Sequence, residues 1–413
     1  MSRQQVPHRY IALLERLYSG QTGQVITDKE SKTFPISRGT KQGDPISPKL
    51  FSAVLEDVMR EVIDRWKSCG YGVRLGDEAA DTLTNLRFAD DILLIATSKE
   101  MLCSMISDLQ QAAKLVGLNM HMGKTKILTN SYARHTERQE WCEVGGAKIE
   151  ILASADSTKY LGRSLSLTDF HTTELEARIG AAWRCFLARK EELCNKKYPL
   201  QERLRLFEAT VSKTALYGCE CWTMSAADRS RLQTTQRKML RWIVGISRWK
   251  SSSVAQSETS NSSDKHSSSS GSSDSETEGP TPWEENFVDW IQRATGLATW
   301  ELRKANLEDW VTQQRRIYWR WAGHTCRRID DRWAVKALRW TPTHGSRAVG
   351  HPKKRWIDDL FLYADRCDVD LDRKRLHYII RHCGEATDGH GKRSVHLWRT
   401  WWKSHEDEFV KAL

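Results

Sequence analysis

Two adjacent acidic residues, Asp90 and Asp91, form the sharpest chemical feature of the sequence, in the run Arg87-Phe88-Ala89-Asp90-Asp91-Ile92-Leu93-Leu94. Residues Ile92 to Thr97 predict a strand that is buried from Ile92 to Ile95, and Thr82 to Arg87 predicts its hairpin partner. Paired carboxylates at such a tip are costly unless a cation lies beside them. Mg²⁺ prefers oxygen ligands, and two such ions can hold the attacking and leaving oxygens in phosphoryl transfer. The alternative is an ordinary exposed turn, in which aspartate is common.

Helices on both sides of this hairpin are predicted to position it. Ser47 and Pro48 indicate a helix start, with Ser47 as the cap and Pro48 in the first turn. Thr97 and Glu100 form a capping-box pattern for a second helix, which should end at Gly117. A hairpin between two packed helices is typical of the split βαβ arrangement. The apolar stripe of the first helix consists of Phe51, Val54, Leu55, Val58, Met59 and Val62.

The charge of the chain favours a polyanionic partner. The 413 residues carry a formal net charge of +11, which suits nucleic acid, although an ordinary basic protein remains an alternative. The first ten residues lack the apolar run of a signal peptide, and no apolar stretch is long enough to span a bilayer. We therefore expect an intracellular protein that does not insert into membranes.

The ten cysteines are scattered, and we expect thiols in a reducing compartment. Cys219 and Cys221 form a C-x-C pair, and Cys383 follows His382. Neither pair has a second ligand pair at zinc-finger spacing. Buried thiols are therefore the preferred interpretation over a structural zinc site.

A serine-rich segment divides the chain. Fourteen of the thirty residues from Ser251 to Pro280 are serine, so we expect residues 250–282 to be a disordered linker, either passive or a phosphorylation target. Before it, residues 164–249 predict a basic helical bundle with 15 Lys and Arg against 9 Asp and Glu. Apolar residues at helical spacing predict three helices, the third starting at Ser225. They are Leu175, Ile179, Ala182 and Phe186 in the first, Leu204, Phe207 and Val211 in the second, and Leu232, Met239, Trp242 and Ile243 in the third.

Residues 283–413 predict a basic, mainly helical domain that holds 12 of the 18 tryptophans. Arginine and tryptophan interleave in Arg315–Trp321 and in Trp398–Lys403. Aromatic rings stack on unpaired bases and guanidinium groups bind phosphates, so this composition suits single-stranded nucleic acid. A helical core packed with tryptophan, with arginine stems over the rings, fits equally well.

Four short motifs in order resemble those of reverse transcriptases, in the form typical of non-LTR (LINE-like) retrotransposons. Arg38–Pro48 resembles motif B, Phe88–Asp91 resembles motif C, Gly117–Thr125 resembles motif D, and Lys159–Gly162 resembles motif E, the primer grip. Gly350–Asp359 resembles a G-R-P-x-x-R-W-x-D-D run near the C-terminus of many LINE-type proteins. His121 and His351 depart mildly from the usual asparagine and arginine.

The resemblance implies a role for each matching residue. Asp90 and Asp91 would be catalytic metal ligands for two Mg²⁺ ions, and Lys124 would either protonate the leaving pyrophosphate or make a plain phosphate contact. The substrate pocket would include Gln42, Gly43, Asp44 and Pro45, together with Phe88 and Ala89 of the hairpin. The primer end would be positioned by Tyr160, Leu161 and Gly162.

The family's motif A, which carries the first catalytic aspartate, should precede the segment Tyr10–Tyr18. That segment resembles the helix after motif A, and no Asp or Glu lies between Met1 and Arg9. We therefore expect an α+β fold in which an incomplete reverse transcriptase palm (1–163) is followed by a helical thumb (164–249), the linker and the C-terminal domain. The isolated chain should have little polymerase activity, because two-metal transfer needs a carboxylate from a second strand.

The implied reaction is synthesis of DNA on an RNA template, with target DNA as primer and deoxynucleoside triphosphates as substrates, in the nucleus and cytoplasm. Two alternatives stay open. One is a non-catalytic remnant that binds RNA or RNA–DNA hybrid, and the other is an unstable fragment that exposes a sheet edge and an apolar face.

Overall fold

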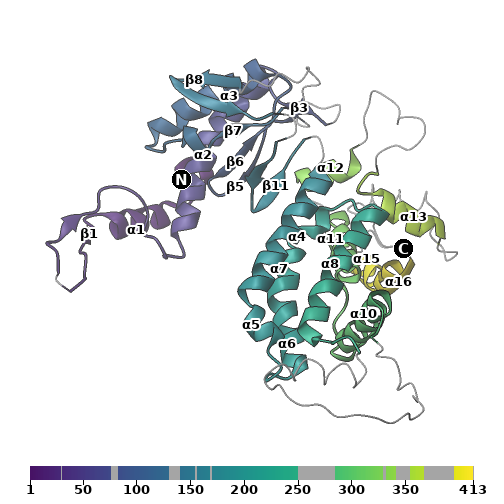
Figure 1. The fold of residues 1–413 in the computed structure, drawn as a ribbon. Helices are drawn as coiled ribbons and strands as arrows, with labels where there is room; N and C mark the ends of the chain where they lie inside the picture. The colour runs from purple at the N-terminus through teal and green to yellow at the C-terminus, as the bar shows by residue number, and fades with distance from the viewer. Residues whose placement is uncertain are drawn as a thin grey trace, which may run out of the picture. The chain divides into compact units, whose positions relative to one another are not determined.

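The computed structural model describes residues 1–28, 30–75, 82–129, 140–153, 156–167, 170–249, 284–328, 332–340, 354–366 and 395–412. The chain forms two compact units (Figure 1). The first contains Met1–Phe170 and Asp330–Arg347, and the second contains His171–Ile329 and Ala348–Leu413. No helix among the described residues is both long and apolar enough to cross a membrane. The predicted linker at 250–282 lies outside the described residues.

The first unit is mixed α+β. Its helices are α1 (His8–Tyr18), α2 (Ser47–Ser68), α3 (Lys99–Leu115) and α12 (Trp333–Arg339), with 3-10 turns η1 (Ser2–Gln4) and η3 (Met122–Lys124). Its strands are β1 (Thr22–Gly23), β2 (Phe34–Pro35), β3 (Val73–Arg74), β4 (Thr82–Leu83), β5 (Asn85–Phe88), β6 (Asp91–Leu94), β7 (Lys126–Ile127), β8 (Glu140–Val144), β9 (Ala147–Ile151), β10 (Thr158–Tyr160) and β11 (Arg163–Leu165). The strands pair as β1–β2, β3–β4, β5–β6 and β10–β11, and as a sheet of order β7–β9–β8.

A core between α2 and α3 supports the β5–β6 hairpin, as the predicted helix–hairpin–helix order requires. Trp66 of α2 is fully buried, and its indole Nε1 donates a hydrogen bond of 3.1 Å to Asp108 of α3. Ile92 and Leu94 of β6 pack against the same core. The buried members of the α2 stripe are Leu55, Val58, Met59 and Val62, whereas the predicted member Val54 is exposed.

Several predicted boundaries are wrong by a few residues. The N-cap of α2 is Ile46 rather than Ser47, whose hydroxyl instead donates a hydrogen bond of 2.6 Å to the Lys41 carbonyl. Ser98, not Thr97, caps α3 by accepting from the Met101 amide, because Ser98 has the extended backbone of an N-cap. The strands expected at Thr82–Arg87 and Ile92–Thr97 are shorter in the structure, where β5 and β6 have four residues each.

The apolar run of β6 is half-buried rather than fully buried, although Ile92 and Leu94 pack against the α2–α3 core and Leu94 also packs against the core of the β7–β9–β8 sheet. The apolar side of α1 is also uncovered: no α1 residue is buried, and Tyr10, Leu13 and Leu17 are exposed.

A disulfide joins Cys103 of α3 to Cys142 of β8, which corrects the expectation of thiols throughout. The two cysteines are 39 positions apart in the sequence and meet because α3 packs against the β7–β9–β8 sheet. Their spacing gave no sign of this pairing.

The second unit is helical (Figure 1). Before the serine-rich segment it contains α4 (Phe170–Ala188), α5 (Lys190–Cys194), α6 (Leu200–Phe207), the π-helical turn η4 (Glu208–Ser212), α7 (Lys213–Ala215), η5 (Cys219–Cys221) and α8 (Ala226–Val244). After it come α10 (Phe287–Lys304), α11 (Trp310–Cys326), α13 (Asp358–Arg366), α15 (Val395–Ser404) and α16 (Glu406–Ala412). The predicted start of α8 is confirmed, since Ser225 and Asp228 form a capping box.

One core contains side chains from both sides of the serine-rich segment. Trp310 of α11 is fully buried, stacks on Phe207 of α6 at a centroid distance of 5.7 Å, and donates from Nε1 to the Ser212 hydroxyl at 2.8 Å. Ala298 and Leu302 of α10 join the same core. The domain boundaries at 163, 249 and 282 stay predictions, but α10 and α11 do not have a core separate from that of the predicted thumb.

The interleaved arginines and tryptophans of α11 belong to packing rather than to an open surface. Trp319 is buried against Trp402 and Phe409. Arg316 forms ion pairs with Glu308, Glu406 and Asp407 at 2.6 to 2.8 Å, and these contacts keep its pKa above the ordinary arginine value. Of the two interpretations offered above, the tryptophan-packed core therefore fits this helix.

The described part of the Gly350–Asp359 run binds the predicted thumb. The Trp356 indole donates to the Glu220 carbonyl at 2.8 Å, and Asp359 pairs with Arg229 of α8 at 3.2 Å. Gly350, His351 and Pro352 lie outside the described residues, as do His382 and Cys383.

Replacing Trp310 with alanine should destabilise the helical unit by about 3–5 kcal/mol, because it removes a large buried ring and leaves a cavity. The same change at Trp300 of α10, whose side chain is 54% exposed, should cost less than about 1 kcal/mol. Denaturant unfolding of the full chain measures both. Equal costs would contradict the shared core.

Candidate functional site

The β5–β6 hairpin presents its carboxylates at an exposed tip. Phe88 pairs with Asp91 in the register, so Ala89 and Asp90 make the turn, and Ala89 has a positive φ of 51°. Both aspartates are exposed, and the Phe88 side chain is 66% exposed. The carboxylates thus remain in water while the β6 residues that follow them pack on the α2–α3 core.

An ion-pair network fixes the hairpin to α2. Glu56 accepts from Arg87 of β5 at 2.9 Å and from Arg60, one helical turn further along α2, at 2.8 Å. Burial raises the pKa of Glu56, but the hydrogen bonds and charges of the two arginines outweigh it, and the net pKa is lowered. Glu56 is not among the residues predicted from the sequence. An acidic side chain on the polar face of a helix gives no signal of a partner 31 residues away.

The predicted motif B loop leads directly into α2. Gly43 has a φ of 86°, which favours glycine, and no atom lies within 4 Å of the position of a Cβ there. The Asp44 carboxylate accepts from the Ile46 amide at 3.1 Å and shapes the turn. Phe51, one turn into α2, packs on the same core as Ile92 of β6, so the loop and the hairpin arise from neighbouring elements. Gln42 and Pro45 are exposed.

The predicted primer-grip residues form the turn of the β10–β11 hairpin. Leu161 and Gly162 both have positive φ, 49° and 74°, as a tight two-residue turn requires. Burial raises the pKa of the Tyr160 phenol, and the negative charge of Asp91 raises it further. The charge of Asp91 therefore acts on the Tyr160 phenol, and this electrostatic interaction links two of the predicted motifs.

Lys124 is exposed at the end of η3, and no side-chain hydrogen bond or ion pair holds it among the described residues. The charge of Asp91 thus influences Tyr160, while the roles of Tyr160 and Lys124 stay predictions.

The donor set for a metal is only partly present. Carboxylate oxygens are the right donors for Mg²⁺. However, within the described residues no group of three or more Asp, Glu, His and Cys side chains could hold a metal ion. Asp90 and Asp91 alone do not make a complete two-metal site.

Comparison with known proteins identifies the first unit. Residues 1–165 match the family model described as "Reverse transcriptase (RNA-dependent DNA polymerase)". Over 291 residues the chain is 30% identical to a putative uncharacterized transposon-derived protein of Caenorhabditis elegans, an alignment that covers 70% of this chain and 88% of that protein. The matched family region ends at β11, so it includes the carboxylate hairpin and the Tyr160 turn.

Retrotransposon polyproteins are also similar. The chain is 32% identical over 131 residues to the Pol polyprotein of the type-1 element R2 of Nasonia vitripennis, covering 30% of this chain and 12% of the polyprotein. It is 27% identical over 169 residues to the Pol polyprotein of the type-2 element R2DM of Drosophila melanogaster, covering 39% of this chain and 15% of the polyprotein. The alignments thus span a small part of these two relatives.

Replacing Asp91 with asparagine should lower the pKa of the Tyr160 phenol, because it removes a negative charge that opposes phenolate formation. Burial of the ring, the larger cause, remains, so the pKa should stay above the ordinary tyrosine value. An NMR titration of ring-labelled tyrosine measures this. Asp90→Asn is the matched control and should leave Tyr160 unchanged; equal effects of the two variants would contradict the contact.

Proposed function

Because this chain belongs to the reverse transcriptase family, related to R2 retrotransposon Pol and transposon-derived proteins, we propose that it is part of the RNA-directed DNA polymerase of a non-LTR retrotransposon. Its parent enzyme would copy element RNA into DNA, with nicked genomic DNA as the primer and deoxynucleoside triphosphates as substrates. Such work on chromosomal DNA would take place in the nucleus.

The observation that carries the proposal is the exposed Asp90–Asp91 tip of the β5–β6 hairpin within the matched region 1–165, whose charge acts on the Tyr160 phenol. A polymerase must hold a primer end beside carboxylates that receive divalent cations. The exposed tip offers the carboxylates, and the β10–β11 turn offers a half-buried phenol beside them. At Gly43, no atom lies within 4 Å of the position that a Cβ would take. This leaves room for a nucleotide or the template backbone to approach the turn closely.

Divalent ions, when bound, would stabilise the charge that develops on the transferred phosphate. The residues of this chain contribute two carboxylates to that site but no described third one. We therefore propose that the isolated chain positions primer and template without efficient catalysis.

The same observations favour a second candidate, a remnant that binds RNA or RNA–DNA hybrid without catalysis. Two carboxylates without a third among the described residues do not support catalysis. The net charge of +11 still favours binding to nucleic acid. Loss of the Asp90 carboxylate distinguishes the two: it abolishes extension by a polymerase and leaves the affinity of a binding protein intact.

Primer extension on a primed RNA template, with Mg²⁺ or Mn²⁺, tests the proposal. The purified chain should give little or no complementary DNA. A chimera that joins a motif A segment from an R2 relative ahead of Met1 should extend the primer, since it supplies a third carboxylate that the described residues do not place beside Asp90 and Asp91. Asp90→Ala in that chimera should reduce extension at least about a hundredfold, as loss of a metal ligand disrupts the site.

Robust synthesis by the unmodified chain would contradict the incomplete metal site. Extension by the chimera that does not depend on Asp90 would contradict the polymerase assignment. Asp57→Ala, which changes an exposed carboxylate on α2, serves as the matched control and should leave extension unchanged.

A further inference from the structure

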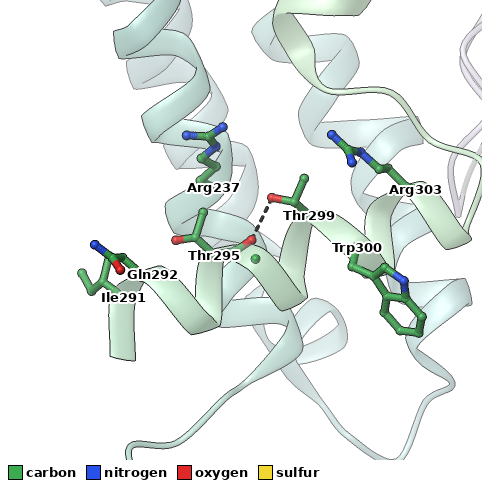
Figure 2. Close-up of a pocket in the computed structure, with 8 residues that line it drawn as sticks. Arg237, Ile291, Gln292, Thr295, Thr299, Trp300 and Arg303 are labelled. Carbon is green, nitrogen blue, oxygen red and sulfur yellow. Dashed lines mark hydrogen bonds between the residues drawn. The ribbon is translucent and has the colours of Figure 1, made fainter. Parts of the chain in front are cut away.

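A groove between α8 and α10 in the helical unit is lined mostly by polar and basic residues. Its volume is about 480 Å³, within the range of ligand sites in proteins. Figure 2 shows Arg237 of α8 facing the Thr295–Thr299 turn of α10, with Arg303 further along and the Trp300 ring at the rim. The lining also includes Ile291, Gln292 and Gly296.

The positive charge of this groove is not compensated within the described part of the chain. Neither Arg237 nor Arg303 forms an ion pair or a side-chain hydrogen bond there. Arg241, one turn after Arg237, donates only to the Thr295 hydroxyl, at 2.9 Å. Burial and the neighbouring Arg237 both lower the pKa of Arg241. Clustered guanidinium groups without carboxylates are suited to an anion, and phosphates accept their paired N–H donors.

The arginines of α11 provide an internal contrast. Arg316 and Arg320 carry the same charge, but Glu308, Glu406 and Asp407 surround them. The carboxylates that pair with Arg316 and Arg320 of α11 thus have no counterpart at Arg237 and Arg303 of the α8–α10 groove within the described residues. That difference marks the groove as a surface for an external ligand.

Trp300 adds an aromatic face to the anion site. Its side chain is 54% exposed, and Lys304 lies over the ring at 4.8 Å from the centroid. An unpaired base can stack on such a ring, whereas bases inside a duplex are already stacked on one another. The Gln292 amide has no partner among the described residues and offers both a donor and an acceptor to a ribose hydroxyl.

We propose that the α8–α10 groove binds single-stranded RNA, with Arg237 and Arg303 on its phosphates and Trp300 stacked on a base. The choice of RNA over DNA rests on the proposed function, in which the template is RNA. The groove itself rests on charge, exposure and packing in the helical unit, and its use does not require polymerase chemistry.

Fluorescence anisotropy of the full chain with a labelled single-stranded RNA of about 12 nucleotides tests the inference, since comparable sites span about 4–16 nucleotides. Arg237→Gln with Arg303→Gln should weaken binding about tenfold and lower the slope of log K against log salt by about 1.4, or 0.7 for each lost phosphate contact. The matched control, Arg205→Gln with Arg231→Gln, removes equal charge from arginines paired to Glu202 and Glu176 and should change the slope little.

Two further variants leave the charge of the groove unchanged and test base stacking on Trp300 and the space at Gly296. Trp300→Leu should weaken RNA binding about tenfold, whereas Trp249→Leu, a ring of similar 57% exposure under Arg293, should not. Gly296→Leu keeps every charge but fills the groove, since a Cβ at Gly296 has no atom within 4 Å. It should block binding while the helix stays at least as stable, because glycine is a poor helix former.

Equal losses in the groove variants and their controls, or no RNA binding by the unmodified chain, would overturn the inference. A groove-dependent affinity for single-stranded DNA of the same sequence that equals or exceeds that for RNA would overturn the choice of RNA. These measurements use no primer or nucleotide, so their failure leaves the polymerase proposal intact. Conversely, failure of the chimera to extend a primer would leave the groove measurements standing.

Discussion

Two adjacent carboxylates at the end of a hairpin repel each other and resist burial, and the first unit is arranged around that constraint. Asp90 and Asp91 stay exposed, while Ile92 and Leu94 immediately behind them pack on the α2–α3 core. The Arg87–Glu56–Arg60 network ties the other strand to α2. A partly buried tyrosine, Tyr160, lies close enough to Asp91 for its phenol to respond to that charge. Local negative charge is thus held where divalent cations and a nucleic-acid end can approach.

In the helical unit, two arginines of α11 have carboxylate partners, whereas the arginines that line the α8–α10 groove have none among the described residues. Arg316 and Arg320 join α11 to α16 through Glu406, and the tryptophans beside them fill the core. Trp310 extends that core to α6 and η4. Arg237 and Arg303 instead line the α8–α10 groove without an ion pair among the described residues, and the exposed Trp300 lies in the same lining. Composition alone, rich in arginine and tryptophan throughout, could not separate these two uses.

Sequence patterns predicted local features well where one short segment determines the outcome. The hairpin around Asp90, the capping box at Ser225 and the helix end before Gly117 all depend on neighbouring residues, and the structure contains each of them. The predicted cap at Ser47 is wrong because the helix begins one residue earlier: Ser47 is its first residue, Ile46 is the N-cap, and the Ser47 hydroxyl donates to the Lys41 carbonyl. Contacts between distant segments escaped prediction altogether. These contacts depend on tertiary packing, which no local pattern encodes. They are the Cys103–Cys142 disulfide, the Glu56–Arg87 ion pair and the stacking of Trp310 on Phe207.

The central claim is that the Asp90–Asp91 tip and the Tyr160 turn face the end of a growing primer. The most direct measurement is photocrosslinking from a reactive nucleotide at the primer 3′ end, on an RNA template bound to the full chain, with the adducts mapped by mass spectrometry. The account predicts adducts on residues 88–91 and 160–162. Adducts confined to other parts of the chain, with both turns unmodified, would contradict it.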